Sequence, residues 1–422
     1  MRKSKAEGPP PISKHSFLVH GKFMTSKWDF AHHVVPPISS SSTYRLETAE
    51  RGAAGFCGFC DPKDRSHQRS NIFIYDRLDE PTRAMLEERL AFVEGGEIAV
   101  AFSTGMAAIA AALGVTVKAG DEVVAHHALY GCTYSLLTNW MPRMGVSVKY
   151  ADFTKPAGLR SLLGRKTRAV LYETPVNPTL ELIDIAAVSE IFRKRKIVSI
   201  VDNTFATPFC QRPLALGADI VCHSLTKNIC GFGTDMGGAV IADRGRESDL
   251  LLYRKDFGGV LSPKNAWPIL VYGLPSLELR LRKEEQNALE VARFLEGHPK
   301  VDRVSYPGLE SFPQRDLARK QMTDFDGSFA PSNMVYFVVR GGGKAASRLV
   351  NHCSKHAYTI TLAVSLGQIR TLIEKPTGMT HSALPPAVQR EGHLSPGGVR
   401  LSVGIEDAGD IIRDLREALK SC

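Results

Sequence analysis

Short apolar runs alternate with longer amphipathic stretches from about residue 80 to residue 245. The apolar runs predict seven strands, at 98–102, 122–125, 147–150, 169–172, 197–201, 219–222 and 239–241. Between them, residues 82–93 and 184–195 place apolar side chains on one face at helical spacing, which predicts amphipathic helices. Strands that alternate with helices predict an α/β fold, with a mostly parallel seven-stranded sheet flanked by helices on both faces.

The pattern changes beyond residue 307 and predicts a second, smaller unit. A long helical stretch covers 274–294 and a closing helix covers 408–420, with apolar runs at 334–339, 359–364 and 399–403 between them. Residues 1–70 show little periodicity and predict an extended arm, suited to a subunit interface. We therefore predict an N-terminal arm at 1–75, a large domain at 76–272 and a small C-terminal α/β domain at 273–422.

Composition and charge narrow the classes of function. A chain of 422 residues exceeds what one hydrophobic core supports, and 43% hydrophobic residues with 23% charged residues are typical of a soluble globular protein. No apolar run reaches the roughly 20 residues that a membrane span needs, and the N-terminus lacks the apolar segment of a secretory signal. These features predict a cytoplasmic protein without a membrane partner.

The net charge of +9 raises the possibility of a nucleic-acid partner. The densest basic run, at 193–196, lies at the end of a predicted helix, where cations favour the helix dipole. The other charges are dispersed and no recognition motif accompanies them, so we predict no nucleic-acid partner. Among eight cysteines only Cys57 and Cys60 are close in sequence, and no second pair completes a metal site. We predict no metal, although another subunit could complete a half-site.

Lys227 is the strongest candidate for chemistry. It ends the run Ser224-Leu225-Thr226-Lys227, 25 positions after Asp202, which itself ends an apolar run. A lysine amine can form a Schiff base with pyridoxal 5′-phosphate (PLP), and an acidic residue can keep the pyridine nitrogen protonated. The hydroxyls of Ser224 and Thr226 could bind the cofactor phosphate. On this motif alone, an ordinary solvated lysine at a strand exit is the better interpretation.

Other polar residues follow predicted strands in the same manner. In parallel sheets the carboxyl ends of the strands carry the site, and Thr104, His126, Glu173, Asp202 and Ser224 all lie just past such ends. Gly105 lies between a strand and a helix, where backbone amides can approach a phosphate, or it is simple turn punctuation. The ring of Tyr130 could stack on a flat cofactor, or it is a half-buried core residue.

Taken together, these segments resemble the Cys/Met-metabolism family of PLP enzymes, the cystathionine γ-synthase and γ-lyase group. The similarity runs in order from about residue 15 to the C-terminal helix. The matching segments are 75–78 with 81–82, 104–106, 130–133, 173–178, 201–204, 224–227, 363–367, 379–382 and 399–404. The resemblance implies the type I fold of PLP-dependent transferases and a homotetramer built from closely paired dimers.

The resemblance also implies roles for individual residues. Lys227 would carry PLP, Asp202 would pair with the pyridine nitrogen, and Asn177 would lie near the phenolic oxygen. Tyr130 would stack on the ring and act as acid or base, and Arg400, assisted by Ser365, would bind the substrate α-carboxylate. The phosphate would be held by Thr104, Gly105, Met106, Ser224 and Thr226, with Tyr75 and Arg77 from a neighbouring subunit.

Three further residues resemble those of methionine γ-lyases. Cys132, Lys255 and Asp256 match positions that border the substrate side chain in those enzymes. Each also has an ordinary interpretation, as a small buried residue for Cys132 and a surface ion pair for the other two. We predict γ-elimination of L-methionine to methanethiol, 2-oxobutanoate and ammonia. The alternatives are cystathionine γ-lyase activity, and γ-replacement on an O-acyl-homoserine by an O-acetylhomoserine sulfhydrylase or cystathionine γ-synthase. The intact Lys227, Asp202 and Arg400 argue against a non-catalytic homologue.

The chain departs from the family pattern near the entrance of the expected site. Glu80 stands where asparagine is usual, and Thr234 stands where an aspartate is usual, with Asp235 following it. Residues 59–71 form an insertion that could act as a lid or a subunit contact. These departures bear on substrate choice rather than on PLP binding.

Overall fold

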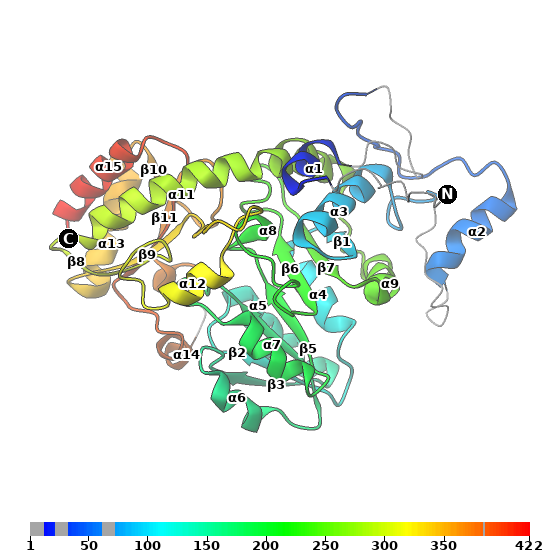
Figure 1. Cartoon of the computed structure of the whole chain (residues 1–422), viewed down its shortest axis with the longest axis horizontal. Coiled ribbons are helices and arrows are strands. Elements are labelled where there is room, and N and C mark those ends of the chain that lie inside the picture. The colour runs from blue at the N-terminus through cyan, green and yellow to red at the C-terminus, as the bar shows by residue number, and fades with distance from the viewer. Residues whose placement is uncertain (1–11, 22–32, 61–71, 383–384) are drawn as a thin grey trace, which may run out of the picture.

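The chain folds into two β-sheets that lie side by side, each covered by helices (Figure 1). The computed structural model describes residues 12–21, 33–60, 72–382 and 385–422, and the side chains of 57–60 lie outside that description. The first sheet lies in the centre of Figure 1, and the second lies beside the C-terminus.

The first sheet contains the seven predicted strands in the order β1-β7-β6-β5-β4-β2-β3. Only β7 runs antiparallel to its neighbours, so the prediction of a mostly parallel sheet is confirmed. The strands are β1 (Ile98–Phe102), β2 (Glu122–His126), β3 (Ser147–Ala151), β4 (Thr167–Glu173), β5 (Val198–Asp202), β6 (Ile220–Ser224) and β7 (Gly238–Ala242).

Helices cover both faces of this sheet because successive strand residues point to opposite sides. On β1, Val100 packs on the face covered by α4 (Gly105–Gly114) and α9 (Glu247–Phe257). The flanking Ala99 and Ala101 pack on the other face, against α3 (Pro81–Glu94) and α10 (Pro263–Pro268). Further along that second face lie α6 (Pro156–Leu162) and α7 (Ile185–Arg193).

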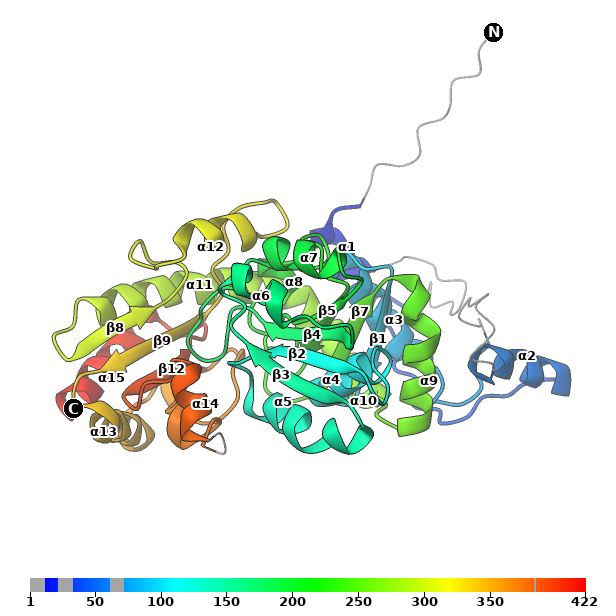
Figure 2. The ribbon, with the colours of Figure 1, turned by 90° about the horizontal axis from the view of Figure 1, so that it is seen from below.

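The second sheet has five strands in the order β10-β11-β12-β9-β8. They are β8 (Val301–Ser305), β9 (Met334–Val339), β10 (Ile360–Leu362), β11 (Thr371–Glu374) and β12 (Gly398–Ser402). One face packs under α11 (Leu274–Glu296), α13 (Gly342–His356) and α15 (Ala408–Lys420), as Figure 2 shows from below. Val399 and Leu401 belong to that core, so Arg400 points the opposite way.

The N-terminal segment is less extended than expected, because it contains two helices that the sequence pattern did not predict. α1 (Lys14–His20) packs Phe17 against Phe92 of α3, with ring centroids 3.8 Å apart. α2 (Ala49–Cys60) contacts only α9 and lies apart from the main body (Figure 1). The insertion at 61–71 and the side chains of Cys57 and Cys60 lie outside the described residues. The predicted domain boundaries stay predictions.

Short elements connect these units. They are α5 (Gly131–Ser135), α8 (Thr207–Cys210), α12 (Arg315–Gln321) and α14 (Pro386–Glu391), with single turns at Leu136–Trp140, Pro142–Met144, Arg244–Arg246, Ile269–Gly273 and Pro376–Gly378. Within the described part of the chain, no helix combines the length and apolar character that crossing a bilayer requires.

Candidate active site

The carboxyl ends of the parallel strands open into a cavity of about 470 Å³. Residues from both sheets line it, as expected where a site lies at the carboxyl edge of a parallel sheet. Its lining includes twelve of the predicted site residues, namely Thr104, Gly105, Met106, Tyr130, Cys132, Asn177, Asp202, Ser224, Thr226, Lys227, Ser365 and Arg400. Residues up to 296 positions apart in the sequence, Thr104 and Arg400, therefore meet at one place.

Lys227 follows β6 and points its amine at the second sheet. Its Nζ donates to Ser365 Oγ at 2.7 Å, and Ser365 has a backbone φ of 88°. Burial, followed by the positive charge of Arg400, lowers the pKa of Lys227 from its usual 10.5 to about 8. A neutral amine is the nucleophile that a Schiff base requires, so this environment suits the predicted role.

The lowered pKa predicts how cofactor loading depends on pH. The neutral fraction of Lys227 rises as pH approaches about 8 and is nearly complete above it. We expect the rate at which apoprotein takes up added PLP, followed by visible absorbance, to rise with pH and level off above about 8. A rate that still rises roughly tenfold per unit between pH 8 and 10 would show an ordinary lysine.

Asp202 is the last residue of β5 and is held in place by its own turn. Its Oδ1 accepts hydrogen bonds from the backbone N–H of Thr204 at 3.0 Å and from Thr204 Oγ1 at 2.5 Å. Burial raises the pKa of Asp202, because a charged carboxylate is costly without a cation beside it. A protonated ring nitrogen is the kind of partner that this carboxylate needs.

The N-terminus of α4 approaches β6 closely enough to form a phosphate cradle. Thr104 caps the helix by accepting from Ala107 N at 3.1 Å. A Cβ on Gly105 would lie 2.8 Å from Ser224 Cβ, so only glycine allows this approach. Thr226 Oγ1 accepts from Gly237 N at 3.1 Å. Free amides at the helix start and hydroxyls on β6 together suit the phosphate of PLP.

Arg400 of β12 enters the cavity from the second sheet. Its Nη1 donates to Asn177 Oδ1 at 2.9 Å, and its Nη2 donates to the carbonyl of Ser365 at 2.8 Å. Glu374 on β11 forms an ion pair with the same Nη2 at 3.1 Å. Asn177 and Ser365 thus hold the guanidinium, a contact that the sequence pattern assigned to Ser365 alone.

Tyr130 precedes α5 and lies beside Cys132. Cys132 Sγ is 3.4 Å from the hydroxyl of Tyr130, and Glu173 accepts from Tyr130 N at 3.1 Å. Burial and the neighbouring thiol raise the pKa of Tyr130, while Arg400 opposes the shift. The phenol is therefore protonated near neutral pH and can donate a proton. Burial raises the pKa of Glu173 to about 8.

Four predicted site residues lie outside this chain's own cavity. Tyr75 and Arg77 lie next to the end of α9, which carries Lys255 and Asp256. Arg77 Nη1 donates to the carbonyl of Lys255 at 2.9 Å, and its guanidinium lies 5.5 Å from the centroid of the Tyr75 ring. Tyr75 is 43% exposed and the side chain of Asp256 is 54% exposed. These four residues form an exposed group, which we call the Tyr75–Asp256 cluster.

The two departures from the family pattern have local physical explanations. Glu80 caps α3 through hydrogen bonds from the backbone N–H groups of Thr82 and Arg83, the capping task that asparagine also performs well. Thr234 donates to Asp235 Oδ2 at 2.6 Å, and Asn265 of α10 donates to Asp235 Oδ1 at 3.1 Å. The loop is thereby tied to α10, and the following Met236 lines the cavity.

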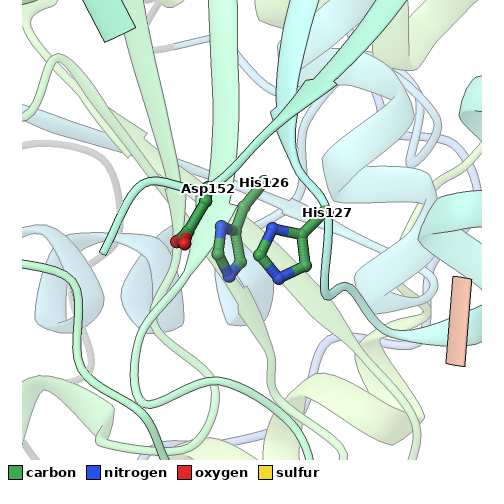
Figure 3. A group of neighbouring side chains, drawn as sticks. All are labelled: His126, His127 and Asp152. Carbon is green, nitrogen blue, oxygen red and sulfur yellow. The ribbon is translucent and has the colours of Figure 1, made fainter. Parts of the chain in front are cut away.

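A second group of potential ligands lies beside the sheet, outside the cavity lining. His126 and His127 at the end of β2 place nitrogens within 4.8 Å of each other and of Asp152 (Figure 3). The Phe153 N–H donates to His126 Nδ1 at 3.1 Å, and Asp152 forms an ion pair with Lys155 at 2.9 Å. Because these ligand atoms already have partners, we assign no metal to the group.

Comparison with known proteins identifies the family. The family described as Cys/Met metabolism PLP-dependent enzyme matches residues 16–420. The chain belongs to this family. The L-methionine gamma-lyase of Porphyromonas gingivalis is 42% identical over 388 residues, covering 91% of this chain and 92% of the relative. The cystathionine gamma-lyase of Bacillus subtilis is 34% identical and covers 97% of this chain and 100% of the relative.

Solved structures of Cys/Met-metabolism enzymes share the whole fold. A cystathionine gamma synthase from Xanthomonas oryzae pv. oryzae superposes with a TM-score of 0.85 at 34% identity, covering 97% of this chain and 98% of the other. A putative O-acetylhomoserine (thiol)-lyase from Campylobacter jejuni gives 0.88 at 30% identity, covering 97% and 100%, and carries a pyridoxyl-lysine monophosphate. The predicted type I fold and the PLP cofactor are confirmed, and the relatives agree with a PLP-dependent carbon–sulfur lyase.

Several residues that shape the site were missed from sequence. Thr204, Glu374 and Thr380 contact predicted site residues directly. The Asp-x-Thr spacing at 202–204 was a usable signal, because a side chain two residues on commonly closes such a turn. Glu374 gave no such signal, since β11 has only four residues and was not predicted as a strand.

Proposed function

We propose that the protein is a methionine γ-lyase, which eliminates methanethiol from L-methionine and leaves 2-oxobutanoate and ammonia. The observation that carries the proposal is the charge distribution of the cavity. Among the described lining residues only Lys227 and Arg400 are cationic, and both have roles at the amino-acid end of the substrate. The remaining wall includes Met106, Ile109, Met236, Val364 and Leu366. Such a wall favours an uncharged thioether side chain.

The relatives support the same proposal. Six L-methionine gamma-lyases are 38% to 42% identical to this chain over more than nine-tenths of its length. Cys132, which lies beside Tyr130, agrees with the resemblance to those enzymes. The cystathionine-cleaving relatives are 34% and 35% identical.

The residues divide the reaction between binding and proton transfer. Arg400, held by Asn177 and Ser365, would bind the α-carboxylate and fix the Cα–H bond in reach of Lys227. PLP, when bound, supplies the electron sink for the pair left at Cα. Lys227 would take the proton from Cα and later one from Cβ, and the protonated phenol of Tyr130 would donate to the departing thiolate.

A product assay tests the proposal. Purified holoenzyme given L-methionine should release methanethiol and 2-oxobutanoate in equal amounts, measured with a thiol reagent and by a coupled oxo-acid assay. Absence of both products with methionine would contradict it. L-Norleucine, which replaces the sulfur by a methylene, is the matched control and should release neither product.

γ-Replacement is the second candidate, and the solved structures favour it to a degree. Both of the structures described above belong to enzymes named as a synthase or a thiol-lyase of O-acetylhomoserine. The cavity wall also accommodates an acetyl ester, which is uncharged. The two functions share Lys227, Asp202 and Arg400 and differ in the acceptor that meets the intermediate carbon skeleton.

We further propose that a second copy of the chain completes the site. The Tyr75–Asp256 cluster is exposed and lies outside the cavity of its own chain, although the family resemblance places these residues at the cofactor and substrate. Exposed Phe257 and Phe56 extend the surface around it with apolar area. The homotetramer of the resemblance would bring this cluster to a neighbour's cavity.

Subunit mixing tests this assembly. We expect Lys227→Ala and Arg77→Ala to be inactive alone but to regain activity when co-expressed. A mixed pair would contain one intact site, so random pairing should restore about a quarter of the wild-type sites. A mixture that stays inactive, although chromatography shows mixed oligomers, would mean that each chain completes its own site.

A further inference from the structure

Glu374 lies directly across from Arg400 in the antiparallel register of β11 and β12. Its carboxylate is 1% exposed, and Oε1 lies 3.1 Å from Arg400 Nη2. We propose that Glu374 is a positioning residue that weakens the hold of Arg400 on the substrate α-carboxylate, so that substrate exchanges and the 2-oxo acid product leaves. The inference rests on the role proposed above for Arg400.

Glu374 is fixed in this position by a second contact. Thr380 Oγ1, from the cavity wall, donates to the same Oε1 at 2.8 Å. The hydroxyl has one proton and gives it to the carboxylate, so His381 Nδ1, 3.0 Å away, must be the donor to Thr380. Glu374 therefore cannot turn away when a substrate arrives without breaking two contacts.

The other partners of Arg400 are neutral. Asn177 and Ser365 accept through an amide oxygen and a carbonyl, and Phe205 places its ring 5.9 Å from the guanidinium carbon. Glu374 thus supplies the only negative charge in direct contact with Arg400 among the described residues. A substrate carboxylate would share the guanidinium with a buried carboxylate and be repelled by it, which offsets part of the attraction.

The charge of Glu374 is also felt inside the cavity. At Lys227, after the effect of burial, Arg400 lowers the pKa and Glu374 raises it. At Tyr130 the two charges again act in opposite directions. Arg400 and Glu374 therefore act on the cavity as a partly neutralised pair rather than as a free cation.

Glu374→Gln tests the proposal, because the amide keeps the shape and the acceptor oxygen but removes the charge. The probe is glycine, which has the α-carboxylate but no γ-carbon, so its binding does not depend on which γ-reaction the enzyme performs. Holoenzyme is titrated with glycine and the visible absorbance of bound PLP is followed. We expect the dissociation constant to fall about tenfold in the variant.

Methylamine is the matched probe, since it presents the same amine without a carboxylate. Its dissociation constant should be the same in both proteins. With the natural substrate, KM should fall while kcat does not rise, and inhibition by 2-oxobutanoate should become stronger. Glu374→Met, which also removes the charge, serves if the glutamine variant does not fold. Unchanged or weaker glycine binding in a folded variant would overturn the proposal, whether or not methionine is cleaved.

Discussion

Replacing Lys227 with alanine should lower turnover about 10³-fold or more and remove the visible absorbance of protein-bound PLP. The side chain supplies both the amine that holds the cofactor and the base that moves the substrate protons, so its loss removes two functions together. Its 2.7 Å contact with Ser365 and its lowered pKa place a reactive amine at the centre of the cavity. The measurements are the visible spectrum of the purified protein and kcat at saturating substrate and PLP.

A second lysine provides the control for this experiment. Lys194 is exposed at the end of α7 and pairs with Glu190, a surface contact that contributes little. Lys194→Ala should keep the spectrum and the activity of the wild type. A Lys227→Ala protein that keeps the same visible band would place the cofactor on another residue, and the assignment would be wrong.

Asp202→Asn should lower kcat by about 10²-fold, the second largest effect expected. Asparagine keeps the acceptor oxygen for Thr204 but cannot hold a proton on the pyridine nitrogen by its charge. Fixed charges at a reacting centre contribute on this scale because the cavity excludes water and needs no reorganisation. The measurement is kcat with methionine at saturating PLP, together with the affinity for PLP.

The chain contains an unusually close control for Asp202. Asp152, just after β3, accepts from Thr154 N at 3.0 Å and from Thr154 Oγ1 at 2.5 Å, the same turn at another strand end. It does not line the cavity, so Asp152→Asn should leave kcat within about twofold of the wild type. Equal losses in both variants would indicate damage to the sheet edge rather than to a cofactor contact.

The first sheet could be predicted from the sequence because its strands are short apolar runs buried on both faces. All seven predicted strands formed, with ends that shifted by at most two residues. The same logic placed Asp202 and Ser224 at the carboxyl edge, where β5 and β6 lie side by side. Local pattern and parallel topology were sufficient to expect that these two residues meet.

The contribution of the second sheet could not be predicted in the same way. β8 has exposed polar positions and β11 ends on the buried Glu374, so neither reads as a plain apolar run. Without β11 the cross-strand contact between Glu374 and Arg400 is invisible in the sequence. The Tyr75–Asp256 cluster was likewise expected from the resemblance, whereas its distance from the chain's own cavity required the fold.

The measurement that tests the account most directly compares two reactions of the same holoenzyme. The kcat/KM for elimination from L-methionine is divided by the kcat/KM for replacement of O-acetylhomoserine in the presence of sulfide. A cavity with its two cations at the amino-acid end and an apolar wall beyond predicts a ratio above one for a methionine γ-lyase. A ratio well below one, with little 2-oxobutanoate formed from methionine, would contradict the proposed function and favour γ-replacement.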